Sequence, residues 1–227
     1  MTNENTDLKF FTNEENDKLL NRFEKTLECA QYFDVLVGYF RTSGFHRLSK
    51  VLEKVEKVRI LVGLNVDNKT YEIYESGITQ QKLDFESHKK ARQHFSYSVQ
   101  SEMEKSEDTP DVQNSVDRFI EFIKTGKLEI RAYPSRDIHA KVYITRYGEP
   151  VSQVEFGSVI TGSSNFSESG FVAQREFNVE LKDTADVQFA LDKFEKLWEE
   201  SVDLSKEYIE TIERTLALIK IPPFKLT

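Results

Sequence analysis

The sequence has 227 residues, of which 38% are hydrophobic and 31% are charged, and its formal net charge is −8. This composition is typical of a globular protein with a sizeable core, and no apolar run approaches the roughly 18 to 20 residues that a membrane span requires. A single cysteine excludes an intrachain disulfide and any cysteine-rich metal site. The N-terminus is acidic and unlike a secretion signal, so we expect a cytoplasmic protein with no membrane contact.

The first sixty residues predict a unit of strand, helix and strand. A helix from about 13 to 31 precedes this unit, and Thr12 to Glu15 have the form of a capping box at its start. Strands are expected at 33–38 and 58–63, and Ser43 could cap the helix between them. Two strands connected through a helix in this way are expected to be parallel neighbours with a right-handed crossover.

The remaining elements follow after a change of pattern. Residues 66–125 lack strand-like alternation, and we interpret them as a helical insertion within one domain that spans residues 1–227. Alternating and apolar runs then predict strands at 128–133, around His139, at 156–160 and at 176–181. Helical spacing of apolar residues returns at 184–200 and at 204–219.

Residues able to bind one phosphate are concentrated between Asp137 and Leu181. His139 and Lys141 lie two apart in an alternating apolar run, so a β-strand would point both side chains to one face. The strand at 156–160 ends in Thr161-Gly-Ser-Ser-Asn165, a turn whose backbone N–H groups and short polar side chains are suited to oxyanions. Glu176 follows, and it shares a strand face with Glu180.

These residues resemble the motif of the phospholipase D superfamily, which reads His-x-Lys, four residues, Asp, then Gly-Ser-x-Asn, and a Glu eleven residues after the Asn. The matching residues are His139, Lys141, Gly162, Ser163, Asn165 and Glu176. Arg146 stands where the family has the Asp, which in the family supports the structure of the motif more than its chemistry. The strict motif covers about forty residues.

The resemblance implies a fold and a metal-independent mechanism. The fold is α/β, with a mixed, largely parallel sheet flanked by helices. In the mechanism, His139 attacks phosphorus, Lys141 and Asn165 neutralise and orient the phosphate, and Ser163 binds either the phosphate or the opposing imidazole. Glu176 fixes the tautomer of His139, although Glu180 could take this role. No metal ion or cofactor is implied.

Further residues are expected to bind substrate around these groups. Gly162 and Ser164 belong to the oxyanion turn, and Arg41 and Ser43 follow the first strand. Tyr39 could line the same pocket or belong to the core. Segments 41–59 and 124–146 each carry a local net charge of +4, which could attract phosphate or could be a set of solvated helix faces and strand edges.

The leaving oxygen needs a proton donor, and an attacking histidine cannot serve as that donor in the same step. Because the chain holds one His-x-Lys, a homodimer with the active site at its interface is the economical prediction. The segments 38–40, 43–45 and 59–63 are also similar to the phospholipase D-like domain found ahead of helicase motors in some bacterial proteins. This similarity implies a DNA endonuclease module of a helicase or of a restriction or defence protein.

Two other functions remain open at this point. A module without catalysis could use the same phosphate pocket to bind nucleic acid or to dimerise. A phospholipid phosphodiesterase would use the same chemistry, but the sequence lacks a lipid-docking amphipathic stretch. Among nucleic acids, DNA is favoured over RNA as the partner.

Overall fold

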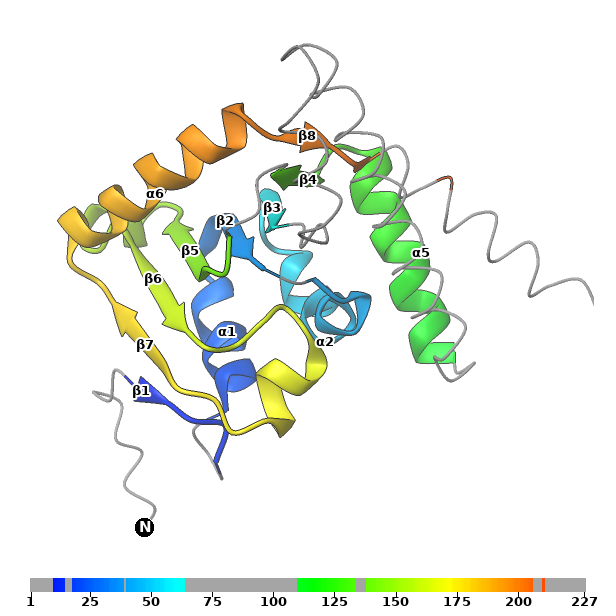
Figure 1. Cartoon of the computed structure of the whole chain (residues 1–227), viewed down its shortest axis with the longest axis horizontal. Coiled ribbons are helices and arrows are strands. Elements are labelled where there is room, and N and C mark those ends of the chain that lie inside the picture. The colour runs from blue at the N-terminus through cyan, green and yellow to red at the C-terminus, as the bar shows by residue number, and fades with distance from the viewer. Residues whose placement is uncertain are drawn as a thin grey trace, which may run out of the picture.

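The computed structural model describes residues 10–14, 18–38, 40–63, 110–133, 138–205 and 210. These residues form one mixed sheet of eight strands in the order β1-β7-β6-β5-β2-β3-β4-β8, with helices on both faces (Figure 1). The strands are β1 (Phe10–Phe11), β2 (Ala30–Val37), β3 (Lys57–Gly63), β4 (Leu128–Tyr133), β5 (Lys141–Tyr147), β6 (Gly157–Gly162), β7 (Asn178–Leu181) and β8 (Val202–Asp203). The helices are α1 (Leu19–Leu27), α2 (Thr42–Leu52), α5 (Pro110–Lys124) and α6 (Thr184–Glu199), with a 3₁₀ turn η1 (Val151–Gln153) and a π turn η2 (Ser169–Ala173).

The predicted mixed sheet flanked by helices is confirmed, but the expectation that it is largely parallel is wrong. The parallel neighbours are β2 with β3, as predicted for the strand-helix-strand unit, and β3 with β4. All other neighbouring strands are antiparallel. The physical reason lies in the connections: parallel neighbours need a long crossover, whereas β5, β6 and β7 follow one another through connections that reverse the chain direction.

The two faces of the sheet bury separate hydrophobic clusters. One cluster lies under α1, α2 and α5 and is rich in aromatic rings, among them Phe23, Phe33, Phe45, Phe119, Tyr143 and Phe171. The other lies under α6, where Val187, Phe194 and Trp198 pack on Leu36, Leu61, Ile144 and Val159 of the sheet. Alternate residues of one strand therefore serve different cores, which fixes the face on which each site residue lies.

The first helix begins later than its sequence pattern predicts. α1 starts at Leu19, and Asn13 instead adopts a left-handed conformation with φ 63°. The Asn13 Oδ1 atom accepts a hydrogen bond from the Leu19 N–H at 2.9 Å, and its Nδ2 donates to Gly170 O at 2.8 Å and Gln174 O at 3.0 Å. Asn13, rather than the predicted Thr12 capping box, thus connects the start of α1 to the η2 turn.

Some predicted elements fall outside the described residues. Within the predicted insertion of 66–125, the structure describes α5, and residues 64–109 lie outside the described ranges, so the rest of the insertion stays a prediction. Most of the helix predicted at 204–219 also lies outside them. In the described part of the chain, no helix combines the length and apolar character needed to cross a bilayer.

The aromatic core provides a test of the packing. Phe23 is fully buried, and its ring lies 5.0 Å from Tyr143, 5.3 Å from Phe171 and 5.8 Å from Phe33, centroid to centroid. Phe23→Ala should lower the free energy of unfolding by about 3–5 kcal/mol, because the cavity forms where helix, sheet and η2 meet. Phe189→Ala, at a position 65% exposed on α6, is the matched control in a urea titration. Equal effects of the two substitutions would contradict this packing.

Candidate active site

The ends of four adjacent strands meet at one edge of the sheet. Val37 at the end of β2 is paired with Lys141 at the start of β5, and Gly162 at the end of β6 is paired with Asn178 at the start of β7. Since β5 and β6 are also neighbours, these ends form a continuous row. All of the described residues that the motif identifies lie at or just beyond this row.

His139 and Lys141 lie on the face of β5 that also carries the buried Tyr143. His139 comes just before β5, in an extended segment whose Ala140 carbonyl accepts a hydrogen bond from Gly38 N–H at 3.1 Å. Its side chain is exposed, and its imidazole makes no hydrogen bond or ion pair in the described part of the structure. The Lys141 ammonium donates to the His139 carbonyl at 2.9 Å. A fixed cation thus lies beside an imidazole that remains open to solvent.

Two glycines make room for the segment that carries His139. A Cβ atom on Gly63 would lie 2.6 Å from the Ile138 carbonyl oxygen, and one on Gly38 would lie 3.1 Å from the same atom. The first distance is shorter than real Cβ contacts allow. The ends of β2 and β3 therefore need residues without side chains, because the chain leading to His139 passes directly over them.

Ser163 and Glu176 are joined across the turn between β6 and β7. The Ser163 hydroxyl donates a short hydrogen bond to the Glu176 carboxylate and accepts one from the Phe177 N–H at 2.9 Å. The Ser163 N–H donates to the Phe177 carbonyl at 3.2 Å. Burial raises the pKa of the Tyr143 phenol well above its ordinary value, and the charge of nearby Glu176 raises it further. The Glu176 carboxylate is therefore held next to Ser163, just beyond the end of β6.

The other carboxylate considered for this role has a different partner. Glu180 is 3% exposed, and its carboxylate lies 2.6 Å from the Arg22 guanidinium of α1. That ion pair belongs to the packing between α1 and β7. The geometry thus favours Glu176 over Glu180 as the carboxylate of the site.

Ser164, predicted to bind substrate, is fully buried. Its hydroxyl donates to Gly170 O at 2.9 Å and accepts from Asn178 Nδ2 at 2.8 Å, and its carbonyl accepts from the Tyr143 hydroxyl at 2.8 Å. A direct contact with substrate does not fit this geometry, because the hydroxyl is already used to hold the turn. Asn178, whose role was not predicted from the sequence, is one of the partners that hold the Ser164 hydroxyl. It could have been found as a polar residue at an inward-facing position of an alternating strand.

Asn165 differs from its neighbour in having hydrogen-bonding capacity left over. Its side chain is partly buried, and its Oδ1 atom is shielded from solvent without a hydrogen-bond partner in the described residues. Its backbone carbonyl, by contrast, accepts from Ser167 N–H at 2.8 Å. An amide oxygen only accepts hydrogen bonds, so a phosphate oxygen at this position would have to meet the Nδ2 group of Asn165 instead.

The remaining predicted residues lie around this edge. Gly162 is exposed, and a Cβ there would lie 2.2 Å from the Phe177 carbonyl oxygen, so the close approach of β7 already requires glycine. Arg41 is exposed, and its N–H donates to Phe166 O at 2.8 Å. The Ser43 hydroxyl accepts from Glu168 N–H at 3.4 Å. Tyr39 lies outside the described residues.

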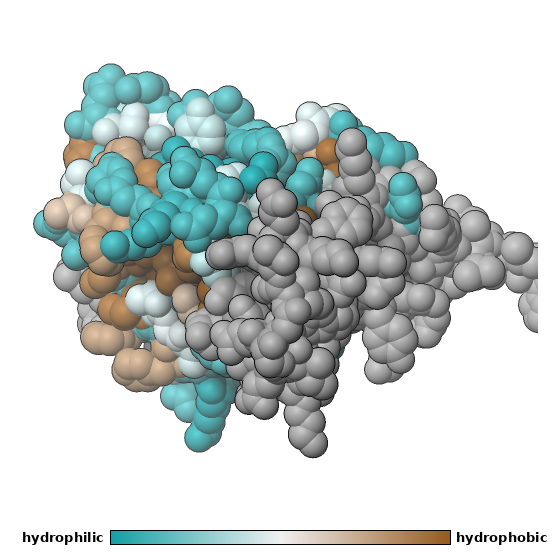
Figure 2. Space-filling model, turned by 45° about the horizontal axis from the view of Figure 1, so that its top comes forward, coloured by the Kyte–Doolittle hydropathy of each residue, from teal (hydrophilic) through white to brown (hydrophobic). Residues whose placement is uncertain are grey.

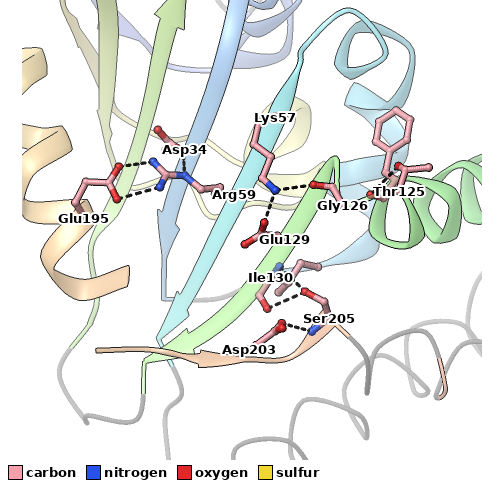
Figure 3. Close-up of polar contacts among 11 residues, drawn as sticks. Asp34, Lys57, Arg59, Thr125, Gly126, Glu129, Ile130, Glu195, Asp203 and Ser205 are labelled. Carbon is pink, nitrogen blue, oxygen red and sulfur yellow. Dashed lines mark hydrogen bonds and ion pairs between the residues drawn. The ribbon is translucent and has the colours of Figure 1, made fainter. Parts of the chain in front are cut away.

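Several basic residues of the segments around the site form ion pairs. The paired residues are Arg47 with Glu168, Lys54 with Glu28, Lys57 with Glu129, and both Arg59 and Arg146 with Asp34. Figure 3 shows Lys57 pointing toward Glu129 and Arg59 lying between Asp34 and Glu195. Pairing lowers the local positive charge of segment 41–59, where four basic residues have acidic partners, whereas in segment 124–146 it is Arg146 that has an acidic partner.

Arg146, which replaces the Asp of the motif, has an acidic partner on the neighbouring strand. Its guanidinium lies 2.9 Å from the carboxylate of Asp34, which is 1% exposed, and 4.3 Å from the centre of the Tyr32 ring. Arg59 binds the other oxygen of Asp34 at 2.5 Å and also binds Glu195 of α6. Burial lowers the pKa of Arg59, but its hydrogen bonds to Asp34 and Glu195 outweigh this and raise it above its ordinary value. A charged contact between strands is thus present at this position, with Arg on β5 and the carboxylate on β2.

No metal-binding cluster of three or more His, Cys, Asp or Glu side chains occurs among the described residues. The groups that the strand ends bring together are an imidazole, an ammonium group, a hydroxyl, a carboxylate and an amide. This set can bind a tetrahedral anion and supply both a nucleophile and a carboxylate to orient it.

The sequence profile of the family described as "Cardiolipin synthase, PLD-like domain" matches residues 23–198. The chain belongs to this family, and with it to the phospholipase D superfamily. The matched range includes every residue of the motif and most of the described sheet. No curated protein matches the chain by sequence.

Several solved structures align with this chain at low sequence identity. Nuc from Salmonella typhimurium, described as a phospholipase D family member, is 14% identical over 86% of this chain and 95% of its own, with a TM-score of 0.47. Phosphatidylserine synthase from Haemophilus influenzae is 16% identical over 92% of this chain, with a TM-score of 0.49. TrmBL2, an archaeal chromatin protein, is 16% identical over 88% of this chain, with a TM-score of 0.41. The chain spans 56% of TrmBL2 and 44% of the synthase.

The contact between Arg146 and Asp34 can be tested by a double-mutant cycle. Arg146→Met should lower the free energy of unfolding by about 1.5–3 kcal/mol, because it removes a charged hydrogen bond from a buried carboxylate. In Asp34→Asn protein the same substitution should cost much less. Lys54→Met is the control, since its ion pair with Glu28 is exposed at both ends and should be worth less than about 1 kcal/mol. Additive effects at positions 34 and 146 would contradict the pairing.

Proposed function

We propose that this chain is a metal-independent phosphodiesterase that cleaves DNA through a phosphohistidine intermediate. The single observation that carries the proposal is the exposed His139 imidazole beside Lys141, on the same sheet edge as the Ser163–Glu176 hydrogen bond. A phosphodiester resists nucleophiles because of its negative charge, so a fixed ammonium group next to an imidazole answers the main chemical difficulty.

In the proposed reaction an imidazole nitrogen of His139 attacks phosphorus, and the P–O bond to the leaving oxygen breaks. The leaving oxygen takes a proton from a second imidazole, which must be protonated at that moment. Water then attacks the phosphohistidine, the P–N bond breaks, and the second imidazole takes the proton from the water. Lys141 and the Asn165 amide N–H group bind the phosphate oxygens. Glu176 accepts a hydrogen bond from the other ring nitrogen of His139 when substrate is bound.

The second imidazole would be supplied by another copy of the chain. His139 is the only histidine of the motif, so a two-fold homodimer with both His139 side chains facing one phosphate completes the reaction without further residues. The similarity to domains ahead of helicase motors further suggests a module of a larger cytoplasmic helicase or of a restriction or defence protein. These assignments to DNA, dimer and helicase belong to the proposal.

A second function has one specific observation in its favour. No hydrogen bond connects the imidazole of His139 to Glu176 within the described residues, although Glu176 is bonded to Ser163. A module that binds nucleic acid through its phosphates without cleaving it would need only Lys141, Ser163 and Asn165. We rank it second because catalytic hydrogen bonds are often long in structures without substrate.

Cleavage of DNA in excess chelator is the first test. The parent protein should cleave with EDTA present, and His139→Ala should reduce the rate by about a hundredfold or more, because the nucleophile is lost. His139 is exposed, so the variant should unfold at the same temperature as the parent. A need for added Mg²⁺ would exclude the covalent-histidine mechanism. Full DNA binding by His139→Ala, with no cleavage by the parent under any condition, would favour the binding module instead.

Subunit mixing is the test of the shared site. Parent protein is mixed with an excess of His139→Ala under conditions of subunit exchange, and cleavage is measured against the parent fraction. Because a site needs one His139 from each chain, activity should fall with the square of that fraction. Mixing with Phe189→Ala should leave activity unchanged. A linear dependence, or a monomer in sedimentation velocity at assay concentration, would rule out the dimeric site.

A further inference from the structure

Two phenylalanine rings, one of which directly follows Glu176 in the sequence, lie exposed where β1 pairs with β7. Phe177 is 62% exposed and Phe10 is 49% exposed, and their ring centroids are 5.3 Å apart with planes tilted by 40°. They lie far apart in the sequence and meet because β1 pairs with β7, with Phe10 opposite Val179. Among the described residues, the large hydrophobic side chains exposed to a similar extent are Val154 and Phe189.

The main chain fixes Phe177 directly beside the site. Its N–H and carbonyl both bond to Ser163, at 2.9 and 3.2 Å, and Glu176 precedes it in sequence. Neighbouring residues of an extended chain point to opposite sides, so the Glu176 carboxylate turns toward the site while the Phe177 ring turns outward at the same sheet edge. Figure 2 shows apolar residues gathered on the side of the molecule where β1 and β7 lie in Figure 1.

We propose that the Phe10–Phe177 pair is a stacking platform for an unpaired base of a single-stranded nucleic acid whose phosphate occupies the neighbouring site. This inference rests on the proposed function and narrows its substrate to unpaired strands. A base and its own phosphate belong to the same nucleotide, so they bind to neighbouring parts of a protein. Phe177 meets this requirement, because it follows Glu176 in the sequence and its main chain is bonded to Ser163. Stacking on exposed aromatic rings is tolerant of sequence and is available only to bases that are not paired.

The charge distribution favours this occupant over the alternatives. The net charge of the chain is −8, and ion pairs use many of the basic side chains near the site. Binding through phosphate contacts alone would be weak for such a protein, so a contact that does not depend on charge has to contribute. Two rings offer only a small aromatic surface, which suits one base better than a lipid bilayer or a large protein interface.

The experiment compares a single-stranded oligonucleotide with one of equal length that carries abasic sites, both binding to His139→Ala protein so that nothing is cleaved. Adding Phe177→Ala should weaken binding to the base-bearing strand by about fivefold or more, and Phe10→Ala should act in the same direction. Binding to the abasic strand should not change. Phe177→Trp should retain binding, whereas Phe177→Leu, which keeps apolar area without an aromatic face, should not.

Phe189→Ala is the matched control, since Phe189 has nearly the same exposure as Phe177 but lies on α6. Equal weakening of both strands by Phe177→Ala would mean that the ring only supports Ser163 and Glu176, and would overturn the platform. If Phe177→Ala dissociates the dimer but keeps base-dependent binding, the rings form a subunit contact and the platform is overturned. If the protein binds phospholipid vesicles and neither strand, the rings contact lipid and the platform is likewise overturned. If the parent cleaves DNA but Phe177→Ala binds the base-bearing strand as tightly as Phe189→Ala does, the platform is wrong and the proposed function stands. If the parent neither binds nor cleaves any strand, the proposed function fails with it.

Discussion

The structure depends on one buried carboxylate in the middle of the sheet. Asp34 is 1% exposed and is bonded by Arg59 of β3 and Arg146 of β5, the two strands that flank its own strand β2. A buried charge is costly unless it is paired and hydrogen-bonded, so Asp34 fixes which strands lie on either side of β2. Arg59 extends the network to Glu195 on α6 and connects the sheet to the helix that covers it.

This network supplies a contact between strands at the position where the family motif has its Asp. Four residues lie between Lys141 and Arg146, and both are on β5, so anchoring the far end of the strand helps to hold its beginning in place. The anchoring interaction needs two opposite charges on adjacent strands, and it does not matter which strand carries the acid. Arg146 therefore has the opposite charge to the Asp of the family motif, but it still forms a contact between strands. It does not contact Lys141 at the start of β5.

The periodicity of apolar residues predicted the helices and strands, because buried positions recur with the period of each element. The partners of the polar side chains depend on contacts between residues far apart in the sequence. The strand-helix-strand unit, the α6 helix and the positions of His139, Ser163 and Glu176 at strand ends followed from alternation and turn residues. Sequence could not reveal that Asp34, an acid within an apolar run, is bonded from both sides, since its partners lie 25 and 112 residues away. The sequence also could not distinguish the roles of Ser163 and Ser164. The Ser164 hydroxyl is buried and bonded to Gly170 and Asn178, whereas Ser163 is exposed.

The same ion pairs that stabilise the fold limit how the protein can attract its substrate. Arg59 and Arg146 are committed to Asp34 and Lys57 to Glu129, so the sequence count of positive charge near the site overstates the field that a phosphate would meet. Within the described residues, the Lys141 ammonium donates to a neutral carbonyl and not to a carboxylate, so its charge is not cancelled there. The proposed site would therefore select a phosphate by position, because a cation, an imidazole and an amide side chain lie at the same edge of the sheet, and the proposed aromatic contact would add affinity that does not depend on charge.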